Sequence, residues 1–274
     1  MHCIINRNEK NRNMKRTAVI IALLALCTPL VWCADTIRVV TINIHQGSDT
    51  TLQFLGQAIG KYNPDLVAVQ EVDMYPQRPE APRQSGKNFI AELGFYADMQ
   101  SVFGKAWDHP GGWDYGDAIL SKHSFSKSES FILKHQDGTE PRQLLLIHTR
   151  IKGHDICFAC THLCHQKTEN RAMQLRQIKQ IMRRQKEKLQ FVCGDLNSDN
   201  KENIVHPVMK GWKDALPDNE GTFSSMRGKS HYKAYKYDYI LYKSNRSIEV
   251  IQYMMECDAA VTDHCICIAD IVIN

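Results

Sequence analysis

The sequence lacks the features that mark several classes of protein. Its 274 residues contain no repeat with a period of 20 to 50 residues and no low-complexity tract, which argues against solenoid, propeller and fibrous architectures. No stretch rich in proline, glycine or serine divides the chain as a linker would. With 43% hydrophobic and 23% charged residues, the composition is that of an ordinary globular protein.

The chain also lacks an excess of charge once its N-terminus is set aside. The whole sequence carries a net charge of +4 at pH 7. Residues 1–33 hold five Lys or Arg and one acidic residue, Glu9, so 29 basic and 29 acidic residues remain in 34–274. A non-specific nucleic-acid binder is expected to carry a basic face that neutralises phosphates. The neutral balance does not exclude a nucleic-acid partner, but it does not favour one.

The N-terminal segment has the three-part pattern of a signal peptide. Basic residues precede an apolar run from Thr17 to about Cys27, and the small residue Ala34 follows. We therefore expect a signal peptide over 1–33, with the true start of the protein near Met14, and a single domain over 34–274. The mature protein would be exported to the periplasm or the extracellular space, and we expect it to be a monomer.

Two alternatives to a cleaved signal are open. The apolar run could stay as an anchor helix, but Pro29 interrupts it and it is barely long enough to span a membrane. Cys33 could carry a lipid anchor, but Trp32 is a poor neighbour for lipidation. After signal removal we expect no stable membrane span.

The cysteines do not form an obvious disulfide framework, because seven of them, an odd number, follow residue 33. Cys157 and Cys160 have the spacing of a zinc knuckle, but they lie in an apolar run typical of a buried strand. Cys193, Cys265 and Cys267 lie in similar runs. Because free cysteine is among the most buried residue types, we predict small core residues. The alternative, a zinc-binding module around Cys157 and Cys160, predicts stoichiometric zinc.

Short β-rich runs alternate with amphipathic helices along the rest of the chain. Periodicity predicts strands at 37–44, 66–70, 117–121, 143–151, 155–161, 189–193, 237–242, 248–254 and 265–273. Helices are expected at 52–62, 87–93 and 169–187. Long irregular connections are expected at 73–86, 103–115 and 222–236. This alternation indicates an α/β domain with a mixed sheet.

Polar groups follow the predicted strands at points where a soluble core would not need them. Singly, each has a structural explanation, such as a turn in which Asp or Asn bonds its own backbone. Jointly they can meet at one edge of a sheet, where like charges need compensation by a cation. Carboxylate and amide oxygens without thiolate suit Mg²⁺ or Mn²⁺. The set is Asn43, Glu71, Asp73, His162, Asp195, Asn197, Asp238, Asp263 and His264.

Eight short motifs occur in order along the chain between residues 36 and 274. They are TINIHQG (41–47), PDLVAVQEVD (64–73), YGDAILSK (115–122), EPR (140–142), THL (161–163), GDLNS (194–198), YDYIL (237–241) and TDH (262–264). In wording and order they resemble the endonuclease/exonuclease/phosphatase family with its DNase-I-like fold, in particular its compact bacterial branch of metal-dependent hydrolases. The resemblance implies a four-layer α/β sandwich in which two packed mixed β-sheets are flanked by helices.

The resemblance also implies roles for the residues of these motifs. Glu71 would be the main ligand of Mg²⁺ or Mn²⁺, with Asn43 and Asp263 nearby. Catalysis would fall to Asp195 and Asn197, which position the attacking water and the phosphate, and to the histidines. Of these, His264 would pair with Asp238 and act as base or as stabiliser of the transition state. His162 would hydrogen-bond a phosphate oxygen. Whether Asp195 or His264 takes the proton of the attacking water stays open.

Substrate contacts are expected from Arg142, Tyr115, Asp117 and His45. Two of these depart from the family's pattern. Asp117 stands where the family usually has Asn, and a carboxylate there would repel a phosphate unless it were protonated or bound a second cation. His45 stands where nucleases of the family often carry Asp.

Together these features predict a metal-dependent hydrolase of phosphoesters, most of all phosphodiesters, that acts by in-line attack of water on phosphorus. A small molecule or a lipid headgroup is the expected substrate. An exported nuclease acting on DNA or RNA is the alternative, to which a basic loop before Asp238 could contribute; the loop contains Arg227, Lys229, His231, Lys233 and Lys236. A catalytically silent binding module is the third hypothesis.

Overall fold

The computed structural model describes residues 35–199, 201–223 and 235–274. The expected signal peptide lies outside the described residues. Asp35–Asn274 forms one compact unit. Within the described ranges, no helix is long and apolar enough to cross a membrane.

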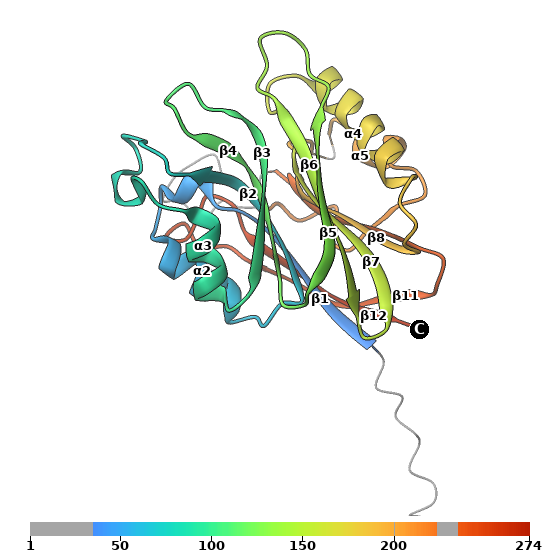
Figure 1. The fold of residues 1–274 in the computed structure, drawn as a ribbon. Coiled ribbons are helices and arrows are strands. Elements are labelled where there is room, and N and C mark those ends of the chain that lie inside the picture. The colour runs from blue at the N-terminus through green and yellow to red at the C-terminus, as the bar shows by residue number, and fades with distance from the viewer. Residues whose placement is uncertain (1–34, 200, 224–234) are drawn as a thin grey trace, which may run out of the picture. The chain divides into compact units, whose positions relative to one another are not determined.

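Two six-stranded sheets form the centre of the domain (Figure 1). The first has the order β11-β12-β1-β2-β4-β3 and the second β5-β6-β7-β8-β10-β9. Both are mixed, because β1 with β2 and β7 with β8 run parallel while the other pairs run antiparallel. The first sheet contains β1 (Asp35–Asn43), β2 (Leu66–Met74), β3 (Gln100–Asp108), β4 (Asp114–Ser121), β11 (Ile248–Glu256) and β12 (Ile266–Ile273). The second contains β5 (Phe125–Leu133), β6 (Arg142–Ile151), β7 (His154–His162), β8 (Leu189–Asp195), β9 (Lys213–Asp214) and β10 (Asp238–Ser244).

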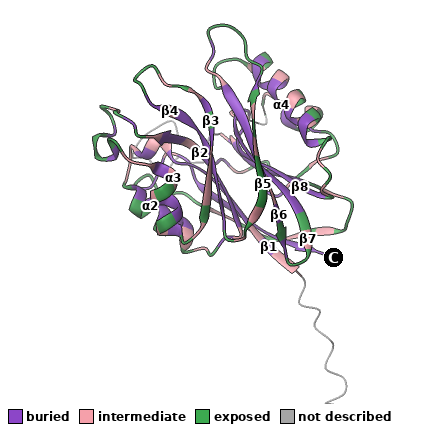
Figure 2. Ribbon diagram, viewed as in Figure 1, coloured by how far each residue is buried: buried purple, intermediate pink, exposed green. Residues whose placement is uncertain are grey.

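Helices cover the outer faces of both sheets, so the predicted four-layer sandwich is confirmed. One core lies between the sheets, and two further cores lie under the helices (Figure 2). Alternation along β1 shows how one strand serves two cores: Ile37 and Val39 face the inter-sheet core, whereas Val40 and Ile42 face the helices. The helices are η1 (His45–Gly47), α2 (Leu52–Gly60), η2 (Pro82–Gln84), α3 (Phe89–Ala97), α4 (Thr168–Met182) and α5 (Val205–Val208).

The prediction of an irregular connection over 103–115 was wrong. Most of this segment belongs to β3 and β4, which form an antiparallel hairpin. The strand β5 was not predicted either. Both β3 and β5 are edge strands of their sheets and are only partly buried, so their sequences carry many polar residues and lack the apolar run of a central strand.

One prediction about cysteine was wrong, because Cys265 was expected to be a free core residue. Cys257 and Cys265 are joined by a disulfide that closes the connection between β11 and β12. The other five cysteines in the described residues are free and buried, as predicted for Cys157, Cys160, Cys193 and Cys267. Cys157 and Cys160 do not share a site, because Cys157 faces the core under α4 and Cys160 faces the core between the sheets. Three residues apart on a strand, they point to opposite faces.

Candidate active site

The predicted polar residues meet around one cavity of about 550 Å³ at the edge of the two sheets. Nine of the predicted site residues line it: His45, Glu71, Tyr115, Arg142, His162, Asp195, Asn197, Asp263 and His264. Three others, Asn43, Asp117 and Asp238, lie just behind this wall and are almost completely buried. The structure therefore brings these twelve residues to one place.

Strand register explains how the centre of the site is assembled. His162 at the end of β7 is level with Asp195 at the end of β8, and Asp195 is level with Asp238 at the start of β10. The close approach of β7 and β8 requires glycine at position 194, where a Cβ would lie 1.9 Å from the carbonyl oxygen of Thr161. Three adjacent strands thus place an imidazole and two carboxylates side by side.

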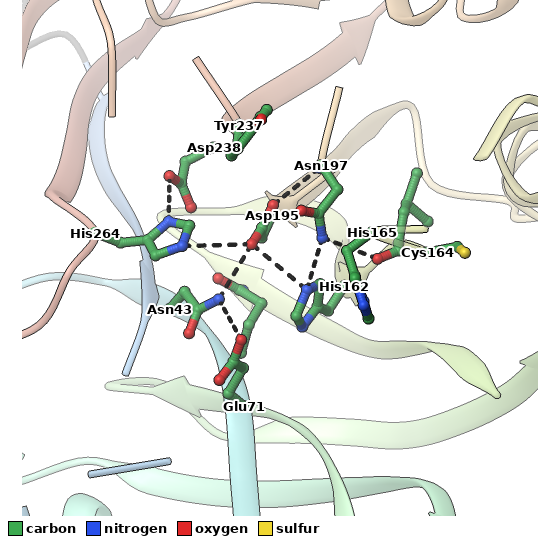
Figure 3. A network of polar contacts seen from close by, with 12 residues as sticks. Asn43, Glu71, His162, Cys164, His165, Asp195, Asn197, Tyr237, Asp238 and His264 are labelled. Carbon is green, nitrogen blue, oxygen red and sulfur yellow. Dashed lines mark hydrogen bonds and ion pairs between the residues drawn. The ribbon is translucent and has the colours of Figure 1, made fainter. Parts of the chain in front are cut away.

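Asp195 is the hub of this centre (Figure 3). One of its oxygens, Oδ2, lies 3.5 Å from His162 Nε2 and 3.6 Å from His264 Nε2. Its other oxygen, Oδ1, accepts the backbone N–H of Asn197 at 2.9 Å. On the far side of the ring, His264 Nδ1 contacts Asp238 Oδ2 at 2.8 Å. The result is a buried Asp238–His264–Asp195 chain that ends at the cavity.

Burial and charge divide the two histidines into different protonation states. Burial disfavours the charged form of His264, but the charge of Asp238, its hydrogen bond and the charge of Asp195 outweigh this and raise the pKa of His264 to about 10. Burial, together with the positive charges of Arg142 and His264, holds the pKa of His162 well below its usual value. Burial, opposed by the charge of His264, raises the pKa of Asp195 to about 7. At neutral pH, His264 is therefore a cation and His162 is neutral.

Glu71 reaches the cavity because of a β-bulge. The pairing of β2 with β4 shifts between Val69 and Val72, so that two residues of β2 oppose one residue of β4. Glu71 has a φ of 61°, a left-handed conformation that is uncommon for residues other than glycine. Such strained residues cluster at functional sites, and here the bulge turns the carboxylate out of the sheet toward the cavity.

The donors around Glu71 fit a hard divalent cation. Glu71 and Asp263 offer carboxylate oxygens to the same cavity, with no thiol among its lining residues. Asn43 Nδ2 donates to Glu71 Oε1 at 3.0 Å and to Asp195 Oδ2 at 3.1 Å. Its Oδ1 accepts the backbone N–H of His45. In this arrangement Asn43 bridges the two carboxylates, and it would have to turn its amide to become a ligand itself. The side-chain amide of Gln46 also contacts Glu71.

Asp263 belongs to a second ligand group on the same wall. His45, Asp49 and Asp263 offer atoms that lie within 4.8 Å of one another. His45 Nδ1 is 2.7 Å from Asp49 Oδ2 and 4.0 Å from Asp263 Oδ1. Asp49 was not among the predicted residues; its position two residues after a predicted motif was the only available signal.

Arg142 forms the opposite, basic wall. Its guanidinium contacts His162 Nδ1 at 3.3 Å, Glu140 Oε2 at 2.9 Å and His165 Nδ1 at 3.2 Å. Asn197 Nδ2 approaches the other nitrogen of His162 at 2.8 Å and also donates to a backbone carbonyl. A neutral imidazole accepts at only one nitrogen, so His162 can accept a hydrogen bond from Arg142 or from Asn197 but not from both.

Asp117 and Asp73 do not reach the cavity wall. Asp117 is buried, and its Oδ2 accepts from Gln143 Nε2 at 3.1 Å. Burial raises the pKa of Asp117 to about 7, so the repulsion of a phosphate expected from the sequence is weakened by both distance and protonation. Asp73 is fully buried and binds Arg78 and Trp113. It supports the wall instead of holding a metal.

Aromatic residues that the sequence did not single out form the sides of the cavity. Trp107 and His109 come from the β3–β4 hairpin, and Phe223 and Tyr237 come from the segments before β10. Phe223 packs on His264 with ring centroids 4.7 Å apart. Of the predicted basic loop, only Lys236 lies in the described residues, and it is buried against Asp214 and Asp218 instead of facing a phosphate.

The two-sheet sandwich and the cavity at its edge define a DNase-I-like α/β domain. The sequence model of the endonuclease/exonuclease/phosphatase family matches residues 40–264, and the chain belongs to this family. No curated protein matches the sequence.

Solved structures share the fold at low sequence identity. An endonuclease/exonuclease/phosphatase protein from Beutenbergia cavernae DSM 12333 is 20% identical, with a TM-score of 0.70 over 88% of this chain and 72% of that one. A mannosyl-6-phosphatase from Bacteroides thetaiotaomicron VPI-5482 is 14% identical, with a TM-score of 0.66 over 86% and 99% of the two chains. Truncated Caenorhabditis elegans TDP2 is 19% identical, with a TM-score of 0.61 over 86% and 97%.

Proposed function

We propose that this protein is a Mg²⁺- or Mn²⁺-dependent hydrolase of phosphoesters. The observation that carries the proposal is the Asp238–His264–Asp195 chain, which ends in the same cavity as Glu71. Carboxylates for a cation, a charged histidine and a carboxylate of raised pKa are the groups that water attack on a phosphoester needs.

The residues divide the chemistry as follows. Asp195 accepts the proton of the attacking water, since its pKa of about 7 suits a general base at neutral pH. His264 stays protonated and stabilises the charge that develops on the phosphoryl oxygens. Arg142 adds a fixed positive charge, and His162 and Asn197 hold a phosphate oxygen. Glu71 and Asp263 would hold the divalent cation, which would supply Lewis-acid stabilisation of the phosphoryl group when bound.

A compact organic phosphoester is the favoured substrate class. The cavity of about 550 Å³ has the size of a small-molecule site, and its aromatic sides suit a sugar or another ring. The balanced charge of residues 34–274 does not favour a nucleic acid as the substrate. One structure of similar fold is a mannosyl-6-phosphatase, which is consistent with a phosphosugar substrate.

Export is part of the proposal. The signal-like pattern of residues 1–33 implies secretion. The Cys257–Cys265 disulfide agrees with it, because disulfides persist in oxidising compartments outside the cytosol.

A substrate panel tests the proposal. Purified protein would be assayed on p-nitrophenyl phosphate, bis(p-nitrophenyl) phosphate, sugar 6-phosphates, sphingomyelin, single-stranded oligonucleotides and plasmid, each with Mg²⁺, Mn²⁺ or EDTA. We expect hydrolysis of the small esters in metal and none in EDTA. Preferred cleavage of plasmid or oligonucleotides with a steep salt dependence would establish the nuclease alternative instead. Inactivity on the whole panel would overturn the proposal and favour the third hypothesis, a catalytically silent binding module.

A further inference from the structure

A second cluster of metal-ligating side chains lies on the outer face of the second sheet. It contains His148 on β6, Cys157 on β7 and Glu187 in the connection between α4 and β8, and one ligand atom from each lies within 4.8 Å of the others. Figure 1 shows β5, β6 and β7 side by side near α4. None of the three residues lines the catalytic cavity. Along β6, His148 is six residues from Arg142, which is about 20 Å at the rise of a strand.

The sheet itself sets the positions of these groups. His148 and Cys157 are direct partners in the antiparallel register of β6 and β7, so their side chains stand next to each other. On the neighbouring strand β5, Glu129 lies diagonally across from His148 and contacts its Nε2 at 3.1 Å. The connection that carries Glu187 is tied to β8 by a hydrogen bond from the Gln190 side chain to the Glu187 carbonyl at 3.0 Å.

The donor atoms in this cluster are not all used within the protein. His148 Nδ1 contacts Glu187 Oε1 at 2.8 Å. The second oxygen of Glu187, Oε2, is buried and accepts no hydrogen bond from the described residues. Cys157 is fully buried, and burial together with the charges of Glu187 and Glu129 raises the pKa of its thiol. A protonated His148 would pair with both carboxylates but would use neither the thiol nor Glu187 Oε2.

We propose that His148, Cys157 and Glu187 bind a thiophilic divalent cation of the zinc class. Thiolate, imidazole and carboxylate form a ligand set typical of Zn²⁺, in contrast to the oxygen-rich wall of the catalytic cavity. Upon binding, His148 Nδ1 exchanges its contact with Glu187 for the metal, and Nε2–H donates to Glu129. Such a carboxylate–histidine pair orients the ring of a metal-bound histidine. The thiol proton of Cys157 is released to solvent, so affinity rises with pH.

The cluster is open to solvent from one side. A surface cavity of about 530 Å³ is lined by Glu129, His148 and Glu187, among other residues, and gives a cation access. Because Glu187 follows α4 while the other ligands lie in the sheet, a bound cation would join the end of the helical layer to the sheet. The site is therefore expected to stabilise the fold and to leave hydrolysis unchanged.

Cobalt titration tests this site separately from catalysis. Metal-free protein, prepared with EDTA, would be titrated with Co²⁺ while the near-ultraviolet thiolate-to-metal charge-transfer band is recorded. We expect one equivalent to produce the band, Zn²⁺ to displace the Co²⁺, and Zn²⁺ to raise the melting temperature. Cys157→Ala should abolish the band, whereas Cys160→Ala, a matched change on the same strand facing the other core, should keep it.

Two further variants make the result decisive. His148→Gln changes a residue near the surface and should weaken Co²⁺ binding by about tenfold or more, which serves if Cys157→Ala does not fold. Glu71→Gln should keep the band, so an error in the proposed catalytic site would not be mistaken for an error in the proposed His148–Cys157–Glu187 site. A wild-type protein without a charge-transfer band, or a band that survives both Cys157→Ala and His148→Gln, would overturn the proposal.

Discussion

Replacing Asp238 with Asn should change the pH dependence of hydrolysis through His264. The two side chains are in direct contact at 2.8 Å and both are buried. Opposite charges about 4 Å apart interact by about 4 kcal/mol at an effective dielectric constant of about 20. This energy corresponds to about three pKa units. The pKa of His264 should therefore fall from about 10 in the wild type to roughly 7 in the variant.

The direction of the effect follows from the proposed role. His264 acts as a cation, so activity is present below its pKa and is lost as pH rises through it. In Asp238→Asn this loss should move to lower pH, and at about pH 8 only about a tenth of His264 should remain charged, which lowers kcat/KM about tenfold or more.

Two measurements check this prediction. NMR titration of the histidine ring protons in metal-free protein reports the pKa of His264 directly, and pH–rate profiles with Mg²⁺ report its consequence. Circular dichroism and thermal unfolding would confirm that Asp238→Asn is folded. An alkaline limb that stays in place, or activity that increases at neutral pH because His264 is a base, would refute the assigned role.

Three further changes have defined outcomes. Glu71→Gln should raise the Mg²⁺ concentration for half-maximal activity at least about tenfold, and an unchanged titration would remove Glu71 as a ligand. Cys257→Ser opens a loop whose ends are 8 residues apart. The free energy of unfolding, measured with urea, should fall by roughly 2–3 kcal/mol. A reductant should lower it equally in the wild type and leave the variant unchanged. Burial raises the pKa of Asp117 from 3.8 to about 7, so its charged form lowers stability as pH rises through this range. Asp117→Asn should increase the free energy of unfolding in EDTA by up to roughly 4 kcal/mol at about pH 8 and by little below about pH 4; equal stabilisation at both pH values would contradict the burial effect.

The convergence of the candidate site residues could be predicted because several of them follow strands with strong apolar patterns. His162, Asp195 and Asp238 each stand at the end or start of a central strand, and neighbouring strands in register must bring such positions together. The same reasoning failed for β3 and β5, since an edge strand is half solvated and its sequence resembles that of a loop.

Other features depend on contacts between segments that the sequence does not reveal to be neighbours. The Cys257–Cys265 disulfide requires the hairpin of β11 and β12. The sequence did not indicate it, because the number of cysteines after residue 33 is odd. Asp117 looked like a substrate contact because of its motif, but strand pleating turns it inward against Gln143. The His148–Cys157 pair is set by the register of β6 and β7, although no short motif joins the two residues.

The central claim is that Asp195, at the end of the buried Asp238–His264 chain, drives hydrolysis of a phosphoester. It is tested most directly by comparing wild type and Asp195→Asn, with equal Mg²⁺, on bis(p-nitrophenyl) phosphate and on the best substrate of the panel. The substitution keeps the shape of the side chain, so folding should be retained. We predict a loss of kcat of about a thousandfold or more. A folded Asp195→Asn variant that retains kcat within about tenfold of the wild type would contradict the account.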